Sequence, residues 1–456
     1  MARDSSNASP IASRDELIAY IAEGAKPAEQ WRIGTEHEKI PFYVKDNRPV
    51  PYEGPRGIRA LLDGMQGLLG WRPIMEGDHP IGLEDVTGGG AISLEPGGQF
   101  ELSGAPLTTL HQMSCETHAH LAQVREVAEP LGIAFLTLGM SPLWSLDDTP
   151  VMPKGRYEIM RRYMPKVGQH GLDMMFRTAT VQVNLDFASE ADMVQKLRIG
   201  LALQPLATAL FANSPFTEGR PNGFQSMRSR IWLDTDADRT GMLPFAFEDG
   251  MGYERYVDWA LDVPMYFVKR GDTYHDVTGA SFKDLMTGRL AALPGERATL
   301  SDWANHLSTL FPEVRLKRYL EMRGADTGST PFLCALPAFW VGLLYDDVAR
   351  DGAWELVKGW SNVDRETLRR DVPVRGLAAT VAGRPLREVA RDVLDLSRAG
   401  LARRGRRDAQ GRDEGHFLDI LDEVVTSGEN AAQRMLARYA DTWRENVEPV
   451  FKTYVY

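Results

Sequence analysis

Alternation of hydrophobic and polar residues predicts several strands in the first two thirds of the chain. The clearest is segment 178–187, TATVQVNLDF, where Val181, Val183 and Leu185 face one side and Gln182 and Asn184 the other. Side chains alternate across a strand, so one face of this segment is expected to cover a core. Further strands are expected at 31–44, at 135–139, at 319–323, and as a pair joined by glycine-rich turns within 86–104.

Helical spacing of hydrophobic residues predicts helices between these strands. Residues 107–131 repeat hydrophobic positions every three or four residues, and the segment after Ser189 is apolar nearly all round, which is typical of a buried helix. The apolar run 332–345 is shorter than the roughly 20 residues of a membrane span, so it is expected to be a buried helix or strand. Residues 346–456 should be mainly helical, with an Arg/Gly-rich loop at 396–415.

The order of these elements predicts the fold class. Strand pairs and helices are mixed without strict alternation, which favours α+β with an antiparallel sheet. There is no internal repeat and no shift of composition that marks a domain boundary. We therefore expect a loose N-terminal tail at 1–12 and a single domain at 13–456, helix-rich from about residue 346.

Composition narrows the function classes. A chain of 456 residues with 43% hydrophobic residues can bury a large core and is not disordered. Its 63 acidic and 52 basic residues give a net charge of −11, without the basic surplus of a nucleic-acid binder. Two cysteines and no apolar leader predict a reducing, cytoplasmic location with no membrane partner.

Two acidic motifs are candidates for metal binding. Glu36 and Glu38 would project from one strand face about 7 Å apart, where two carboxylates repel unless a cation such as Mg²⁺ binds them. The alternative is a solvated strand edge with Lys39 as partner. Glu95 and Glu101 flank a Gly-Gly turn that can bring them together, and the alternative is a surface hairpin with charged rungs.

Arginines complete the candidate chemistry. Glu321 and Arg323 share a face if 319–323 is a strand, either to hold a metal beside a phosphate or as a plain ion pair. Arg156 and Arg228 stand in short basic motifs, and arginine forks bind carboxylates and phosphates, although solvated helix faces would look the same. Paired glutamates with arginines predict a multi-metal site for anionic substrates, as in phosphoryl-transfer ligases or two-metal hydrolases. No phosphate-binding glycine loop or zinc-protease motif is present in the sequence.

Longer motifs resemble one family. The segments GTEHEK, GGGAISLEPGGQFELSGAPLTTLHQ, MPKGRYEIMRRYMPKVG, MFRTATVQVNLDF and RLKRYLEMRGAD resemble glutamate–cysteine ligases of the plant and proteobacterial type. The resemblance implies a glutamine-synthetase-like fold, in which a curved, mostly antiparallel sheet forms a funnel with helices packed outside. It also implies ATP-dependent joining of the glutamate γ-carboxylate to the cysteine amine through γ-glutamyl phosphate, the first step of glutathione synthesis.

The same resemblance implies roles for individual residues. Arg323 and Glu38 would be catalytic, and Arg228, Arg156 and Gln99 would contact substrates. Mg²⁺, with Mn²⁺ as a substitute, is the expected metal, and ATP, glutamate and cysteine are the expected partners of a monomer or homodimer. The implied metal ligands are Glu36, Glu38, Glu95, Glu101, Gln182 and Glu321.

Three alternatives to this function remain open at this point. A related ligase would couple glutamate to another amine, a two-metal phosphohydrolase would hydrolyse ATP or esters without an amino acid, and a binding protein would have no activity. The last is disfavoured because all five glutamates are present.

The cysteines depart from the pattern of the plant enzymes, whose two cysteine pairs are linked to redox control. Val277 and Ala292 occupy the positions of one pair, and Ser114 stands where Cys334 would find its partner, with Cys115 one residue later. One residue on a helix turns the side chain by about 100°. We therefore expect no strong thiol switch.

Overall fold

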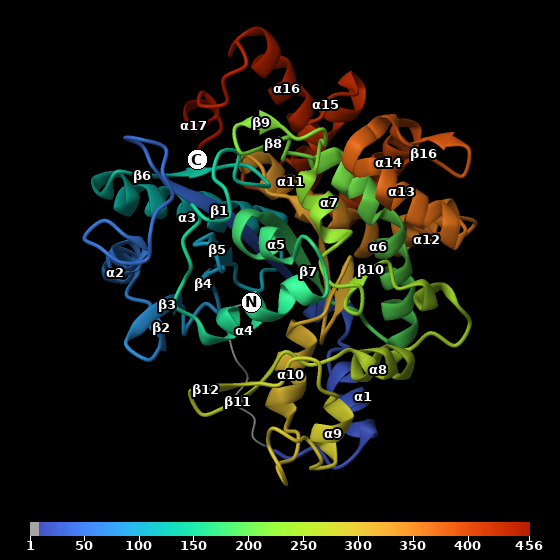
Figure 1. The fold of residues 1–456 in the computed structure, drawn as a ribbon. Coiled ribbons are helices and arrows are strands. Elements are labelled where there is room, and N and C mark those ends of the chain that lie inside the picture. The colour runs from blue at the N-terminus through green and yellow to red at the C-terminus, as the bar shows by residue number, and fades with distance from the viewer. Residues whose placement is uncertain (1–8) are drawn as a thin grey trace.

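A computed structural model describes residues 9–456, which are built around one nine-stranded sheet (Figure 1). The strand order is β14-β15-β7-β1-β5-β4-β3-β2, and β6 also pairs with β1. Every pairing in this sheet is antiparallel, and the order leaves it open at both ends. The predicted α+β class with a mostly antiparallel sheet is confirmed. The strands are β1 (Ile33–Tyr43), β2 (Arg72–Glu76), β3 (His79–Glu84), β4 (Ala91–Leu94), β5 (Phe100–Ser103), β6 (Ile133–Leu136), β7 (Thr180–Leu185), β14 (Val314–Leu316) and β15 (Leu320–Asp326).

Strand β1 is the centre of this sheet and pairs with β5, β6 and β7. The register sets Glu36 opposite Gln182 and Glu38 opposite Glu101. Because side chains alternate across a strand, Glu36 and Glu38 share one face of β1. This register brings acidic side chains from separate segments of the chain to one place.

Helices pack on both faces of the sheet. The apolar face is covered by α3 (Leu110–Leu131), α6 (Glu190–Phe211) and α11 (Thr330–Leu344), whose buried residues share a core with Val181 and Val183 of β7. The run predicted as a buried helix or strand is thus the helix α11. The opposite face carries the candidate site under α4 (Gly155–Tyr163), α5 (Gly171–Arg177), α7 (Met227–Trp232) and the hairpin of β11 (Phe267–Arg270) and β12 (Thr273–Asp276).

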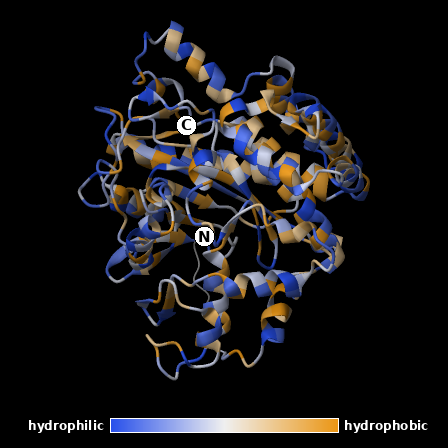
Figure 2. Cartoon of the chain, turned by 45° about the vertical axis from the view of Figure 1, so that its right-hand side comes forward, coloured by the Kyte–Doolittle hydropathy of each residue, from blue (hydrophilic) through white to orange (hydrophobic). Residues whose placement is uncertain are grey.

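The remaining helices lie outside these layers, and their ribbons carry both hydrophobic and hydrophilic residues (Figure 2). No single described helix is long and apolar enough to cross a membrane, and α11 with α12 (Asp347–Val357) meets the length and composition test only as a pair bent by 90°. These outer helices are α1 (Arg14–Ala22), α2 (Ile58–Leu69), α8 (Tyr253–Asp262), α9 (Phe282–Met286), α10 (Leu300–Ser308), α12 (Asp347–Val357), α13 (Asn362–Arg375), α14 (Leu386–Arg404), α15 (Asp419–Ser427), α16 (Ala431–Asp441) and α17 (Val450–Thr453).

Short two-residue strands and 3₁₀ turns complete the described chain. The strand pairs are β8 (Phe216–Thr217) with β9 (Arg220–Pro221), β10 (Thr240–Gly241) with β13 (Phe311–Pro312), and β16 (Thr380–Val381) with β17 (Arg384–Pro385). The 3₁₀ turns are η1 (Ala28–Gln30), η2 (Met164–Lys166), η3 (Pro244–Phe247), η4 (Gly376–Ala378) and η5 (Glu414–Leu418).

Several local expectations need correction. The hairpin β2–β3 and strand β14 had no counterpart in the sequence pattern. Residues 1–8 of the predicted tail lie outside the described residues, but residues 9–12 are anchored, since Ile11 is 1% exposed and donates its backbone N–H to Ala298 at 2.8 Å. Residues 396–404 of the predicted Arg/Gly-rich loop are the end of α14, where Arg403 pairs with Asp346 at 2.7 Å.

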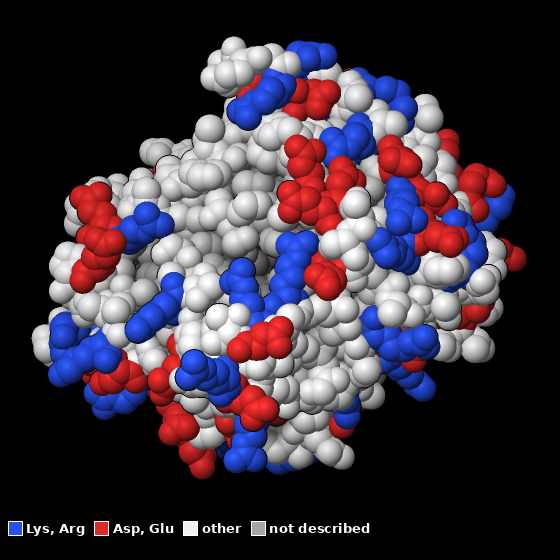
Figure 3. Space-filling view, turned by 90° about the horizontal axis from the view of Figure 1, so that it is seen from above, with Lys and Arg blue, Asp and Glu red and all other residues white. Residues whose placement is uncertain are grey.

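Surface charge is mixed in sign. Seen from above, acidic and basic side chains lie next to one another over much of the surface, around a hollowed area with few charges (Figure 3). The net charge of −11 is therefore not gathered into one acidic patch on this face.

Candidate active site

A cavity of about 70 Å³ opens on the sheet face under α4, α5 and α7. Its floor is formed by β1, β5, β7 and β15, and its walls by the helices and β11. Nine of the ten residues predicted for the site line this cavity, although they come from distant parts of the chain. The nine are Glu36, Glu38, Glu95, Gln99, Glu101, Arg156, Gln182, Arg228 and Arg323.

One end of the cavity is acidic. Glu38 accepts a hydrogen bond from the backbone N–H of Thr180 at 3.0 Å, and Glu101 accepts one from the Ser93 hydroxyl at 2.5 Å. Burial, with the charges of Glu95 and Glu101, raises the pKa of Glu38 well above its usual value. The alternatives of a solvated strand edge and a surface hairpin are wrong here, because β1 is central and Glu101 is 2% exposed.

These three carboxylates have the chemistry of a hard-cation site. Carboxylate oxygens are the ligands that Mg²⁺ and Mn²⁺ take, and a bound divalent cation would relieve the repulsion that raises the pKa of Glu38. Within residues 9–456, no three His, Cys, Asp or Glu side chains converge closely enough to hold one metal ion. The donor set fits such an ion in type and charge, and its side chains would have to rotate toward one another to bind it.

The second acidic group is neutralised by basic residues. Glu321 is fully buried and does not line the cavity; it accepts hydrogen bonds from Arg315 at 2.5 and 2.9 Å and from Arg323 at 3.1 Å. Burial alone would raise the pKa of Glu321, but the charges of Arg315, Lys317 and Arg323 hold it well below its usual value. In this arrangement Glu321 is an ion-pair partner, which is the alternative that its sequence pattern left open.

Gln182 and Arg323 bind each other on neighbouring strands. Arg323 donates from Nη1 to Oε1 of Gln182 at 2.8 Å, so the oxygen predicted to bind a metal is engaged by a guanidinium. Burial, with the charge of Arg315, lowers the pKa of Arg323. Its guanidinium lies 5.7 Å from the ring centre of Phe311 and faces the cavity.

Arg228 and Arg156 approach the cavity from short helices. Arg228, in the first turn of α7, donates from Nη2 to the carbonyl of Arg323 at 2.9 Å and lies 5.8 Å from the ring centre of Trp232. Arg156 is the second residue of α4 and lies 5.3 Å from the ring centre of Tyr157. Both arginines are buried and line the cavity, where they can bind anionic substrates.

Gln99 supports the turn that carries Glu95. Its Nε2 donates to the carbonyls of Thr178 at 2.8 Å and Met175 at 3.3 Å, and its Oε1 accepts from the backbone N–H of Gly97 at 2.9 Å. A Cβ at Gly97 would lie 2.1 Å from the carbonyl oxygen of Phe176, so only glycine allows this close approach. The amide of Gln99 therefore joins the turn to α5.

Several cavity residues were missed by the sequence reasoning. Arg315 had no usable signal, because it lies on β14, a strand of three residues, and only the register of the β14–β15 hairpin shows that it pairs with Glu321. The apolar wall had none, since its residues are scattered over five elements and look like ordinary core positions. They are Met160, Met174, Met175, Trp232, Phe267 and Phe311.

A second cavity of about 520 Å³ adjoins the first and shares Glu36 and Ser308 with it. It lies at the start of β1 and beside the β14–β15 turn. Burial and the charge of Arg315 lower the pKa of Lys317 in its wall to about 8. Four basic residues line it: Lys26, Arg32, Lys317 and Arg318.

The thiols are both free. Cys334 of α11 is buried and its Sγ lies 3.7 Å from Oγ of Ser114 on α3, whereas Cys115 is exposed. The residue facing Cys334 is thus a serine, as expected from the helical offset.

Curated relatives are similar over nearly the whole chain. A chloroplastic glutamate–cysteine ligase of Arabidopsis thaliana is 57% identical over 444 residues, which cover 97% of this chain and 83% of the relative. Chloroplastic glutamate–cysteine ligase B of Oryza sativa subsp. japonica is 56% identical over 444 residues, covering 97% and 87%. Because these relatives are named as chloroplastic, the cytoplasmic location predicted from the sequence is wrong.

A solved structure and a family model complete the comparison. The crystal structure of a Francisella tularensis glutamate–cysteine ligase with AMP has a TM-score of 0.54 at 11% identity, covering 93% of this chain and 87% of that one, and so shares the fold. The sequence model described as glutamate–cysteine ligase family 2 matches residues 32–453. The chain belongs to this glutamate–cysteine ligase family.

Proposed function

We propose that the protein joins the γ-carboxylate of L-glutamate to the amine of L-cysteine while ATP is converted to ADP and phosphate. The observation that carries this proposal is one cavity, in a chain of this family, where buried glutamates and arginines face each other. Glutamate and ATP bring several negative charges together, and the site offers Arg228 and Arg323 to bind them. The two arginines thus allow the cavity to bind anionic substrates although acidic residues also line it.

The chemistry proceeds in two steps. An oxygen of the glutamate γ-carboxylate attacks the γ-phosphorus of ATP, which forms γ-glutamyl phosphate and releases ADP. The cysteine nitrogen then attacks the γ-carbonyl carbon, phosphate leaves and the amine loses a proton. Arg323 stabilises charge on the transferred phosphoryl oxygens, and Arg228 binds the glutamate α-carboxylate.

Glu38, Glu95 and Glu101 are the residues proposed to hold Mg²⁺, or Mn²⁺ in its place. Bound there, the ion would supply positive charge beside the ATP phosphates. Glu36 and Gln182 line the same cavity and extend this set. Glu321 joins it only if Arg315 releases one of its oxygens.

The second cavity is the proposed place of the ATP base, ribose and α-phosphate. Its volume of about 520 Å³ and its four basic residues suit a nucleotide. Since it meets the first cavity at Glu36 and Ser308, a nucleotide there can extend its terminal phosphate toward Arg323. This geometry supports ATP as the phosphoryl donor.

ADP release tests the proposal. Purified protein with Mg²⁺ and ATP is given glutamate alone, cysteine alone, or both, and we expect rapid ADP formation only with both. Equal rates with and without amino acids would point to a phosphohydrolase, and faster release with another amine than with cysteine would point to a related ligase. Replacing Glu36 by Gln should abolish turnover, and full activity of that variant would remove Glu36 from the site.

A further inference from the structure

Asp326 is a buried carboxylate at the end of β15 with no direct place in the chemistry above. It is 1% exposed and does not line the cavity. Oδ2 accepts hydrogen bonds from the Ser214 hydroxyl at 2.7 Å and from the backbone N–H of Asn213 at 2.8 Å, and Oδ1 accepts one from the Ser226 hydroxyl at 2.8 Å. Both oxygens therefore hold the segment that leads into α7.

The two serines connect Asp326 with the first turn of α7. The Ser226 hydroxyl, which donates to Asp326, also accepts from the backbone N–H of Ser229 at 3.1 Å and caps the helix. The Ser214 hydroxyl does the same for the backbone N–H of Arg228 at 3.1 Å. Each hydroxyl thus bridges the carboxylate and a backbone N–H of the helix, and the place of the carboxylate determines the place of that N–H.

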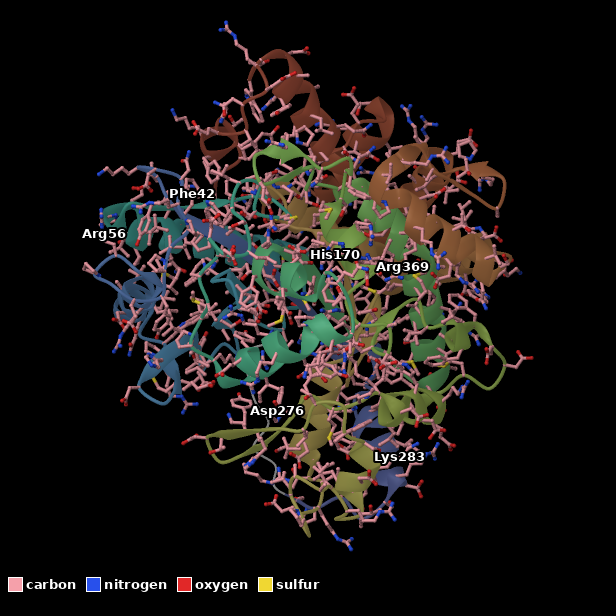
Figure 4. All side chains as sticks on the ribbon, viewed as in Figure 1. Phe42, Arg56, His170, Asp276, Lys283 and Arg369 are labelled. Carbon is pink, nitrogen blue, oxygen red and sulfur yellow. The ribbon has the colours of Figure 1, made fainter. Side chains whose placement is uncertain are left out.

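This arrangement fixes α7 relative to β15. Arg228 of α7 donates to the carbonyl of Arg323 on β15, so the helix and the strand are joined directly by this hydrogen bond. They are joined a second time through Asp326 and Ser214. The other end of α7 is held by Arg369 of α13 (labelled in Figure 4), which donates to the carbonyl of Trp232 at 3.3 Å. A Cβ at Gly139 would lie 2.5 Å from the Asp326 side chain, so the chain passes as close to it as glycine permits.

We propose that Asp326 is a positioning residue that sets Arg228 at the right distance to bind the α-carboxylate of glutamate. The inference rests on the proposed function, since it concerns how that substrate is bound. Asp326 acts through Ser214 and Ser226 and touches no substrate. Its removal should therefore weaken glutamate binding while leaving nucleotide binding and the chemical step nearly intact.

The test compares wild type with Asp326→Asn in steady-state kinetics and by calorimetric titration with L-glutamate. Asparagine keeps the shape, but its Nδ2 cannot accept a hydrogen bond from a serine hydroxyl. We expect the KM for glutamate and its dissociation constant to rise at least about tenfold, with kcat and the KM for ATP changed less than about threefold. Ser226→Ala should give a smaller rise in the same direction, and it replaces Asp326→Asn if that variant does not fold.

The control is Glu414→Gln. Glu414 is equally buried, accepts from the first backbone N–H of α3 at 2.7 Å and does not line the cavity. Its replacement should lower stability without changing the KM for glutamate. Asp326→Asn or Ser226→Ala could lower kcat only because less protein is folded. If the KM and the dissociation constant for glutamate then stay at their wild-type values, the inference is overturned. Wild-type protein that releases no ADP with both amino acids would instead overturn the proposed function.

Discussion

Arg315 binds Glu321 through two hydrogen bonds across the β14–β15 hairpin, at 2.5 Å from Nε and 2.9 Å from Nη2. Neither side chain is more than 1% exposed. A pair taken out of water in this way is costly to break, because the remaining charge has no solvent to stabilise it. The pair therefore makes β14 and β15 depend on each other.

Replacing Arg315 by Met should lower the free energy of unfolding by about 3 kcal/mol, because Glu321 would stay buried with fewer partners. Urea unfolding measures this change. Adding Glu321→Gln to that variant should restore part of the stability, since no carboxylate is then left without its partner. The matched control is Arg384→Met, which breaks a half-exposed pair with Asp392 and should cost less than about 1 kcal/mol. An Arg315 variant as stable as this control would contradict the prediction.

Replacing Glu38 by Gln should separate activity from stability. Burial and the neighbouring charges of Glu95 and Glu101 raise the pKa of Glu38, so removing its charge relieves repulsion in the metal-free protein. We expect the variant to be at least as stable as wild type without metal, yet to release ADP at least about 100-fold more slowly. Thermal unfolding with a chelator and the ADP assay provide both values. Glu126→Gln, on an exposed position of α3, serves as control. A Glu38 variant less stable than wild type would contradict the prediction that this carboxylate is repelled by its neighbours.

His306 should make the fold sensitive to acid. Its Nε2 lies 2.7 Å from the carbonyl oxygen of Ala260, and burial lowers its pKa from 6.5 to about 4. The unfolded chain binds a proton below pH 6.5 and the folded chain does not until about pH 4, so stability is lost as pH falls through this window. The contribution at pH 4 is about 3 kcal/mol.

The measurement is the free energy of unfolding in urea at several values between pH 7 and pH 4. His306→Gln keeps a donor for Ala260 and cannot take up a proton, so its stability should fall less steeply than that of wild type. His118→Gln, on the exposed side of α3, is the control. Parallel curves for wild type and His306→Gln would show that this histidine does not cause the acid sensitivity.

The thiols should give no redox response until one residue is changed. Wild-type activity should be the same with and without dithiothreitol, because Cys334 faces Ser114. Replacing Ser114 by Cys should allow a disulfide with Cys334, since the atoms concerned already lie 3.7 Å apart. Thiol titration and non-reducing mass spectrometry detect the bond. Cys115→Ser is the control, and a reversible effect of dithiothreitol on wild type that this replacement abolishes would contradict the prediction.

Local sequence patterns predicted which side chains share one face of a strand or lie together at a turn, but they did not predict the partners of those side chains. The two-residue spacing of Glu36 and Glu38 and the Gly-Gly turn before Glu101 are properties of neighbouring residues, so they could be interpreted without a structure. The partners of Glu321 depend on β14, a strand of three residues whose pattern is too short to predict. For that reason its burial against Arg315 could not be foreseen.

The remaining site residues are set by tertiary packing. Gln99 was predicted to contact substrate, and only the fold shows its amide bound to the carbonyls of Thr178 and Met175. The roles predicted for the cavity residues stay predictions, since geometry gives their positions and not their chemistry.

The strand order of the sheet has a consequence for how the protein folds. Glu38 and Thr180 are 142 residues apart in the chain, and Gln182 and Arg323 are 141 apart, yet each pair is hydrogen-bonded. Such contacts between distant segments form slowly, because a long loop must close before the strands gain anything from pairing. During refolding we expect helical signal and tryptophan burial to return first and ADP release last, so that recovery of turnover reports the closing of the sheet around β1.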